Sequence, residues 1–259
     1  MTKIEVILSP AEFPALAQRD LRKSACVVFD ILRATTTMIT ALANGAEAII
    51  PVGEIFEALA LRQQRPEVLL AGERQGARIR ADLTGGIDFD LGNSPREYTP
   101  AKVRGKTIVS TTTNGTRALR ACAGAKNTLL GSFLNLRATC QWLLEHRPQE
   151  LILVCSGTHE EPALEDLIAA GAVCERVWPH YAGGHISDAA EIARRIYPLM
   201  QSDLLGAMNY SRNGRHLLSI PELRGDVAYC VQRETLSFVV EMLADGSIRK
   251  WQSQNASAP

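Results

Sequence analysis

A run of hydroxyl and amide side chains, placed between a predicted strand and a predicted helix, is the clearest chemical feature of the chain. Residues 107–110 are apolar and β-branched, which is typical of a buried strand. The polar run that follows consists of Thr111, Thr112, Thr113, Asn114, Gly115 and Thr116. Backbone N–H groups and the helix dipole favour an anion at the start of a helix. The run therefore predicts either an anion site or an ordinary turn whose threonines cap the helix.

Charged residues follow other predicted strands. Asp30 and Arg33 come after the predicted strand 25–29, and Glu73 comes after the predicted strand 68–71. Ligands of α/β sheets bind at the C-terminal ends of the strands, so we expect these residues along one edge of a sheet. The other residues expected at this edge are Thr35, Thr36, Gly53, Glu54, Arg74, Ser132, Asn135, Ser156, Gly157 and Thr158.

Two adjacent carboxylates, Glu165 and Asp166, begin a predicted helix that has a regular apolar stripe. Both lie off that stripe and close to the helix N-terminus. Carboxylates in this position can offset the helix dipole on a solvated face, or they can bind a metal ion. Position alone favours the solvated face.

The elements that must position these groups alternate between strand and helix. Further strands are predicted at 4–8, 48–52, 128–131 and 152–156, with helices between them. This alternation predicts an α/β fold, with a mostly parallel or mixed sheet and helices on both faces. Near the C-terminus, 227–232 and 236–242 predict two late strands or a β-hairpin, and 244–247 predicts a turn.

The second half of the chain resembles the first. Residues 37–46 align with 116–125 at a constant offset, and each half reads strand, threonine-rich loop, helix, strand, helix, Arg-Pro, strand. The pattern predicts either a duplicated βαβαβ unit or two stretches that are alike because βα units share the same physics. We expect a first α/β lobe at 1–105 and a second lobe with C-terminal strands at 106–259, or one compact domain overall.

The charge balance excludes some classes of partner. Lys+Arg and Asp+Glu are equal at 28 each in 259 residues, so no net charge attracts nucleic acid or an anionic membrane. No apolar run reaches the roughly 18–20 residues of a membrane span, and the N-terminus has no signal-peptide pattern. The 6 cysteines form no CxxC pair and are expected to be reduced core thiols. We therefore expect a cytoplasmic protein. We also expect a homo-oligomer whose partner is a small polyanionic substrate, and neither nucleic acid nor a membrane.

Six short motifs occur in a fixed order between about residues 25 and 240. They are 28–37 (VFDILRATTT), 72–74 (GER), 90–95 (DLGNSP), 111–116 (TTTNGT), 131–135 (GSFLN), and Gly157-Thr158 with Glu165-Asp166. Each motif alone is weak, but together they are specific, and the chain resembles the 2-phosphosulfolactate phosphatase family. Two segments depart from the family pattern, 75–78 (QGAR) and 159–162 (HEEP). Either departure is compatible with a changed substrate and an intact phosphate site.

The resemblance implies an α/β Mg²⁺-dependent phosphatase that converts 2-phosphosulfolactate to sulfolactate on a route to coenzyme M. It implies catalytic roles for Asp30, Glu73 and Arg33. It also implies metal binding by Asp30 and Glu73, with Glu165 or Asp166 as a third ligand. The implied substrate-binding residues are Thr35, Thr36, Asn93, Ser94, Thr112, Thr113, Asn114, Gly115, Thr116, Arg117, Ser132 and Asn135. We expect 111–116 to hold one anionic end of the substrate and 33–37 to hold the other.

Plainer roles for these residues stay open. Asp30 could order its loop, Glu73 could pair with Arg74 or Arg33, and Arg117 could be a surface arginine. Other phosphatase mechanisms fit less well. A haloacid-dehalogenase-type site needs Asp at position 32, a cysteine phosphatase loop needs Arg at 161, and neither residue is present.

The threonine loops lack a Walker lysine motif, and no histidine pair has zinc-ligand spacing. These observations favour metal-activated water over a covalent intermediate. The alternatives are another reaction on a phosphorylated acid and a non-catalytic anion-binding module.

Overall fold

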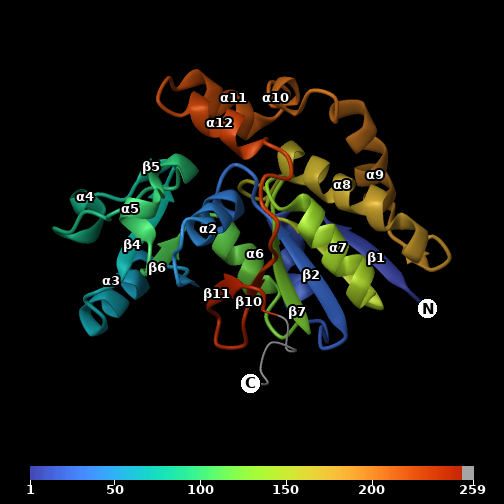
Figure 1. Ribbon diagram of the computed structural model, residues 1–259, viewed down its shortest axis with the longest axis horizontal. Coiled ribbons are helices and arrows are strands. Elements are labelled where there is room, and N and C mark those ends of the chain that lie inside the picture. The colour runs from blue at the N-terminus through green and yellow to red at the C-terminus, as the bar shows by residue number, and fades with distance from the viewer. Residues whose placement is uncertain (253–259) are drawn as a thin grey trace.

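The computed structural model describes residues 1–252 and has an α/β architecture built around one mixed sheet (Figure 1). Its strands are β1 (Lys3–Ile7), β2 (Ser24–Phe29), β3 (Ala48–Pro51), β4 (Leu69–Arg74), β5 (Ala77–Arg78), β6 (Thr107–Thr111), β7 (Asn127–Gly131), β8 (Glu150–Cys155), β9 (His185–Ile186), β10 (Val240–Met242) and β11 (Ile248–Lys250). Its α-helices are α1 (Phe13–Ala17), α2 (Ala34–Ala43), α3 (Ile55–Gln64), α4 (Ala81–Thr84), α5 (Pro100–Val103), α6 (Gly115–Ala121), α7 (Leu136–His146), α8 (Leu164–Tyr181), α9 (Asp188–Met200), α10 (Leu204–Ala207), α11 (Arg212–Ser219) and α12 (Arg224–Cys230). Two 3₁₀ helices, η1 (Pro10–Glu12) and η2 (Pro95–Glu97), complete the described elements. The predicted fold class is confirmed.

The 11 strands have the spatial order β5-β4-β6-β3-β11-β10-β7-β2-β8-β1-β9. One unit of the chain contributes β2, β3 and β4, and a second contributes β6, β7 and β8. β6 lies between β3 and β4, and β2 lies between β7 and β8, with parallel pairing throughout. The antiparallel hairpin of β10 and β11 joins the two groups. The predicted βαβαβ repeat is thus present as a repeated topology. In the sheet, the first strand of each unit lies between the second and third strands of the other unit.

Strands from both sides of residue 105 therefore share one sheet. The lobe boundaries at 1–105 and 106–259 stay a prediction.

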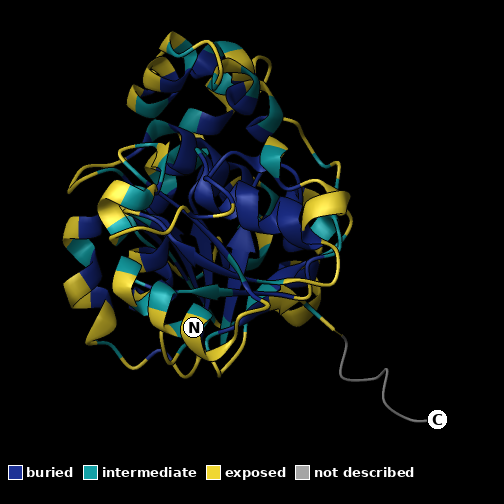
Figure 2. Cartoon of the chain, turned by 90° about the vertical axis from the view of Figure 1, so that its left-hand side faces the viewer, coloured by how far each residue is buried: buried dark blue, intermediate teal, exposed yellow. Residues whose placement is uncertain are grey.

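Strand β2 shows how the layers form, because all of its residues are buried. Val27 and Phe29 face a core that includes residues of α7, α8 and α9. Cys26 and Val28 face a second core, which includes residues of α1, α2 and α6. A parallel strand covered on both faces reads as a continuous apolar run, which is why the sequence identified it. Figure 2 shows the buried residues gathered in the sheet and on the inner sides of the helices.

The C-terminal prediction was partly wrong. Residues 227–232 were expected in a strand, but most of them lie in α12. Val227 and Cys230, which are three positions apart, are both fully buried, a spacing that suits one face of a helix. The predicted hairpin exists, but it pairs β10 with β11 around the predicted turn 244–247. The predicted frayed tail at 253–259 lies outside the described residues.

The polar region between α9 and α12 contains two further helices with side-chain caps. Asp203 accepts a hydrogen bond from the Gly206 N–H before α10, and Ser211 accepts one from the Gly214 N–H before α11. These caps allow short helices in a segment that has little apolar periodicity. The segment brings α11 and α12 to one end of the molecule, above the loops that follow β2 and β8 (Figure 1).

All of the cysteines are buried and have free thiols, as predicted from the sequence. Within residues 1–252, no helix combines the length and the apolar character that a bilayer crossing requires.

Candidate active site

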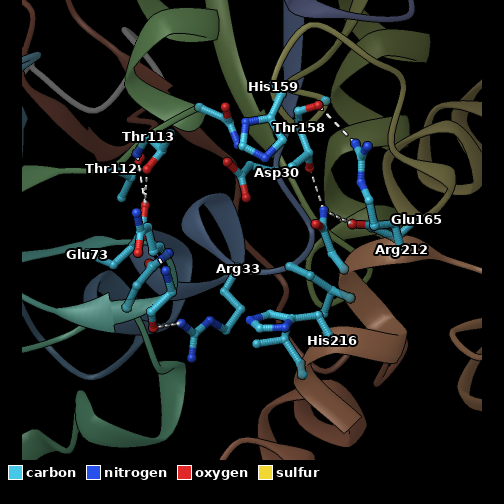
Figure 3. A pocket seen from close by; sticks show the side chains of 18 of the residues that line it. Asp30, Arg33, Glu73, Thr112, Thr113, Thr158, His159, Glu165, Arg212 and His216 are labelled. Atoms are coloured by element: carbon cyan, nitrogen blue, oxygen red, sulfur yellow. Dashed lines mark hydrogen bonds between the residues drawn. The ribbon is translucent and has the colours of Figure 1, made fainter. Parts of the chain in front are cut away.

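A cavity of about 690 Å³ lies at the C-terminal ends of four strands of the sheet (Figure 3). The strands are β2, β4, β6 and β8, and α11 closes the cavity from the C-terminal part of the chain. The lining residues are Asp30, Leu32, Arg33, Glu73, Arg74, Gln75, Gly76, Asn93, Thr112, Thr113, Asn114, Gly157, Thr158, His159, Glu165, Asp166, Arg212, Asn213, His216 and Leu217. The structure therefore brings together the three charged residues for which catalytic roles were expected, Asp30, Arg33 and Glu73.

Asp30 lies at the C-terminal end of β2 and is only 9% exposed. One of its carboxylate oxygens accepts a hydrogen bond from the Ala34 N–H at 2.9 Å. Burial raises the pKa of Asp30 to about 7. The Ala34 N–H and Arg33 oppose this rise, whereas the negative charges of Glu73 and Glu165 add to it. Asp30 is therefore a carboxylate that a nearby cation would stabilise in its charged form.

Glu73 lies against the threonine loop. Its Oε1 accepts hydrogen bonds from the backbone N–H of Thr113 at 2.8 Å and from the Thr113 hydroxyl at 2.9 Å. Its Oε2 accepts one from the Gly76 N–H at 2.7 Å. Thr113 was expected to bind an anionic group of the substrate, but in this structure it binds the Glu73 carboxylate of the protein itself. These bonds fix Glu73 in the cavity, on the opposite side of Asp30 from Glu165 (Figure 3).

Glu165 and Asp166 are 1% and 2% exposed, so the interpretation of a solvated helix face was wrong. Asp166 accepts hydrogen bonds from the backbone N–H groups of Ile31 at 2.8 Å and Gly157 at 3.2 Å. Burial raises the pKa of Asp166, and the charges of Glu165 and Asp30 raise it further. The local apolar pattern identified one buried face of α8 but gave no sign that the opposite face is also covered.

The cover over Glu165 comes from α11 and its N-cap. The Ser211 hydroxyl donates to Glu165 at 2.6 Å, and the Asn213 amide donates to Glu165 and to the Thr158 hydroxyl, each at 2.7 Å. Arg212 pairs with Glu161 and donates to the Thr158 carbonyl. These contacts span more than 45 residues of sequence, and the polar run 209–216 was the only signal of them in the sequence.

Arg33 is buried beside the cavity and is held from two sides. It donates to Asp226 of α12 at 2.7 Å and to the Gly76 carbonyl at 2.8 Å. Asp226 was not among the predicted site residues, because nothing in its local sequence distinguishes it from other helix-surface acids.

Several other predicted site residues point away from the cavity. Thr35 donates to the Gly131 carbonyl and Thr36 to the Ile31 carbonyl, so both hydroxyls serve the protein itself. Asn135 accepts bonds from the Ser132 backbone and hydroxyl. The remaining predicted residues that do not line the cavity are Ser94, Gly115, Thr116 and Arg117.

Arg117 is a half-exposed surface arginine that pairs with Glu160 at 3.0 Å. Of the expected loop 33–37, only Arg33 reaches the cavity. Among the unpredicted lining residues are two histidines, His159 and His216. His159 has the unusual backbone φ of +56°.

The donor set can be compared with what Mg²⁺ requires. Within the described part of the chain, no three His, Cys, Asp or Glu side chains form a ready-made metal cage. Mg²⁺ does not need one, because it commonly uses one or two carboxylates together with waters and substrate phosphate oxygens. Asp30 and Glu73 fit that description. Thr112 Oγ1 and Asn114 Oδ1 are also buried beside them, with no hydrogen-bond partner in residues 1–252.

Comparisons with known proteins agree on one family. The family model for 2-phosphosulpholactate phosphatase matches residues 11–245. A "Probable 2-phosphosulfolactate phosphatase" of Synechococcus sp. is 39% identical over 243 residues, which cover 92% of this chain and 92% of that protein. Proteins of the same name from Caldanaerobacter subterraneus subsp. tengcongensis and Clostridium acetobutylicum are 36% and 32% identical over 241 and 238 residues. Those alignments cover 92% of this chain, and 95% and 96% of the two relatives.

Proposed function

The chain belongs to the 2-phosphosulfolactate phosphatase family and is a phosphoric monoester hydrolase, and on this premise we propose its substrate and cofactor. The proposed substrate is 2-phosphosulfolactate or a similar phosphorylated hydroxy acid, and the proposed cofactor is Mg²⁺. The products would be sulfolactate, on the route to coenzyme M that the sequence resemblance implies, and phosphate.

The observation that carries this proposal is the convergence of four buried carboxylates and one buried arginine on the same cavity. Carboxylates repel a phosphorylated acid unless a cation lies between them and the substrate. A receptor that only bound anions would gain nothing from this arrangement. The arrangement does suit phosphoryl transfer, in which positive charge must face the phosphoryl oxygens.

Asp30 and Glu73 are the proposed Mg²⁺ ligands. Bound Mg²⁺ would neutralise charge on the phosphoryl group and lower the pKa of a coordinated water. Hydrogen bonds from the Thr113 and Gly76 backbones orient Glu73, and the bond from Ala34 orients Asp30. Glu165 or Asp166 would act as the third acidic group, on the α8 side of the cavity.

The substrate's anionic groups would be bound by Arg33 and by the loop 112–114. The Thr113 donors are used by Glu73, so the donors left for the substrate in this loop are the Thr112 hydroxyl, which has no partner within residues 1–252, and the side-chain NH₂ group of Asn114. Arg33 provides the buried positive charge on the other side of the cavity. Two separate anion-binding groups support selection of a polyanionic ester over a singly charged one.

Phosphate release tests this proposal. Purified full-length protein should release phosphate from 2-phosphosulfolactate in the presence of Mg²⁺, and EDTA should abolish the release. Phosphorylated 2-hydroxy acids without a sulfonate should react more slowly, and a simple aryl phosphate should react slowest. Equal rates with EDTA and with Mg²⁺ would overturn the proposed cofactor. No release from any phosphorylated acid would overturn the proposed reaction.

A further inference from the structure

Asp226 is fully buried and is the meeting point of three segments that are far apart in the sequence. One of its oxygens accepts a hydrogen bond from Arg33, in the loop after β2, at 2.7 Å. The other accepts bonds from the Ser94 hydroxyl at 2.6 Å and from the Arg96 guanidinium at 2.7 Å, beside and within η2. Asp226 does not line the cavity, so it can reach a substrate only through Arg33.

The charges around Asp226 leave Arg33 able to bind an anion. If Asp226 paired with Arg33 alone, its negative charge would cancel the positive charge of that guanidinium. Asp226 is instead shared between Arg33 and Arg96. The three side chains together carry one net positive charge. Arg33 also donates to the Gly76 carbonyl, and both bonds use its terminal nitrogens. The guanidinium therefore retains further N–H donors that a bound anion can accept from.

The position of Arg33 matters because of the acids on the other side of the cavity. Arg33 and Asp30 line the same cavity, and the Arg33 charge partly opposes the rise that burial causes in the pKa of Asp30. Without an anchor, the long arginine side chain would be drawn toward Asp30 and Glu73, which it would neutralise. Asp226 supplies a competing, fully buried carboxylate that holds the guanidinium back.

We propose that Asp226 is a positioning residue, which fixes the Arg33 guanidinium so that its remaining N–H groups bind the phosphate or the second acidic group of the substrate. The identity of that anion rests on the proposed phosphatase function. The same contact ties α12 to the loop after β2, so the C-terminal helices contribute to the site through a side chain that never touches the substrate.

A double-mutant cycle between Arg33→Gln and Asp226→Asn tests the proposal. Two quantities are measured in the full-length protein: kcat/KM with 2-phosphosulfolactate, and the affinity for inorganic phosphate by calorimetry. Asp226→Asn alone should lower both by roughly 10–100-fold, the range typical when a supporting group is lost. In the Arg33→Gln background, where Asp226 keeps Arg96 and Ser94 as partners, the same change should alter both by less than about threefold.

Matched controls separate positioning from general damage. Asp20→Asn makes the same charge change in a surface pair, Asp20–Arg22, and should leave both quantities unchanged. If Asp226→Asn does not fold, Asp226→Glu keeps the charge but displaces the guanidinium. It should fold with a lower melting temperature, because a methylene is added at a fully buried site, and it should give the same loss of phosphate affinity.

Equal losses from Asp226→Asn in the wild-type and Arg33→Gln backgrounds would overturn the proposal, as would unchanged phosphate affinity in Asp226→Asn. The phosphate measurement also separates the two proposals. An Arg33-dependent loss of phosphate affinity in a protein that hydrolyses no phosphorylated acid would support the role of Asp226 and reject the proposed reaction.

Discussion

The loops after β2 and β6 occupy equivalent places in the repeated topology, yet they carry different chemistry. The loop after β2 supplies a carboxylate, Asp30, and a guanidinium, Arg33. The loop after β6 supplies only uncharged donors, and Thr113 uses its donors to hold Glu73 of the neighbouring strand β4. The repeat therefore fixes where the functional groups lie, and the side chains decide what each loop does. One loop provides charge directly, and the other orients a charge that a different strand provides.

The two loops also approach each other closely where their helices α2 and α6 begin, at Ala34 and Gly115. A Cβ atom at Gly115 would lie 2.8 Å from the Ala34 Cβ and 2.9 Å from an Asp30 carboxylate oxygen. Only glycine allows this approach, so the close contact of the two units depends on a single missing methyl group.

The largest expected effect comes from removing the charge of the first loop. Asp30→Asn should lower Mg²⁺-dependent hydrolysis by roughly 10²–10³-fold or more, because an amide is a poor ligand for a hard cation. The fold should be retained, since Asn can still accept the Ala34 hydrogen bond. Steady-state rates at several Mg²⁺ concentrations, with circular dichroism of the variant, measure this. Near wild-type turnover at low Mg²⁺ would remove Asp30 from the site.

The pH dependence of stability should also distinguish the two loops, because the loop after β2 carries the buried acid Asp30 and the loop after β6 supplies only uncharged groups. The pKa of Asp30 rises from 3.8 to about 7 on folding, so the folded protein binds more protons than the unfolded chain between these values. Metal-free protein should therefore lose stability as pH rises from about 4 through 7, by at most about 4 kcal/mol. Asp166 acts in the same direction.

Melting temperatures between pH 5 and pH 8, with EDTA and with Mg²⁺, measure this effect. Mg²⁺ should stabilise the protein more at pH 8 than at pH 6, and Asp30→Asn should flatten the EDTA curve. A metal-free protein that becomes steadily more stable from pH 5 to pH 8 would contradict the buried-carboxylate account.

The contact between the loops can be broken at Gly115. Gly115→Ala should destabilise the protein by about 1–3 kcal/mol, because the added methyl group overlaps Ala34 and Asp30. It should also lower turnover by displacing Asp30. Gly183→Ala is the matched control, since a Cβ there has no neighbour within 4 Å. Equal melting temperatures for the two variants would show that the loops are not in close contact.

The smallest effects should distinguish two roles within the second loop. Thr113→Val removes a hydroxyl donor to Glu73 but keeps the backbone donor, so it should weaken Mg²⁺ binding by about 0.5–1.5 kcal/mol. Asn114→Ala leaves Glu73 untouched and should instead weaken inorganic phosphate binding by a similar amount. Calorimetry with Mg²⁺ and with inorganic phosphate measures these two effects. If both substitutions weakened the binding of the same ligand, Thr113 and Asn114 would share one role.

Local patterns predicted the features that depend on neighbouring residues. The apolar runs located β2 and β4, and the rule that ligands bind at strand ends placed Asp30 and Glu73 in one cavity. The repeat was also visible, because each unit follows the same order of elements.

Long-range contacts could not be read from the sequence. The burial of Glu165 depends on α11, and the position of Arg33 depends on Asp226, 193 residues away. The donors of Thr113 were expected to bind a substrate anion, but they bind Glu73, which lies 40 residues earlier in the chain. Ser211, Asn213 and Asp226 follow no local pattern, and Glu73 was identified at its strand end but not as the partner of Thr113, because only the folded chain brings these side chains together.

We propose that one cation is shared by Asp30, from the loop after β2, and by Glu73 of β4, which the loop after β6 holds in place. Crystals of the wild-type protein soaked with Mn²⁺ as a stand-in for Mg²⁺ test this directly through anomalous diffraction. We expect one strong peak in the cavity, within coordination distance of both carboxylates. A peak bound by neither carboxylate, or an empty cavity at millimolar Mn²⁺, would contradict it.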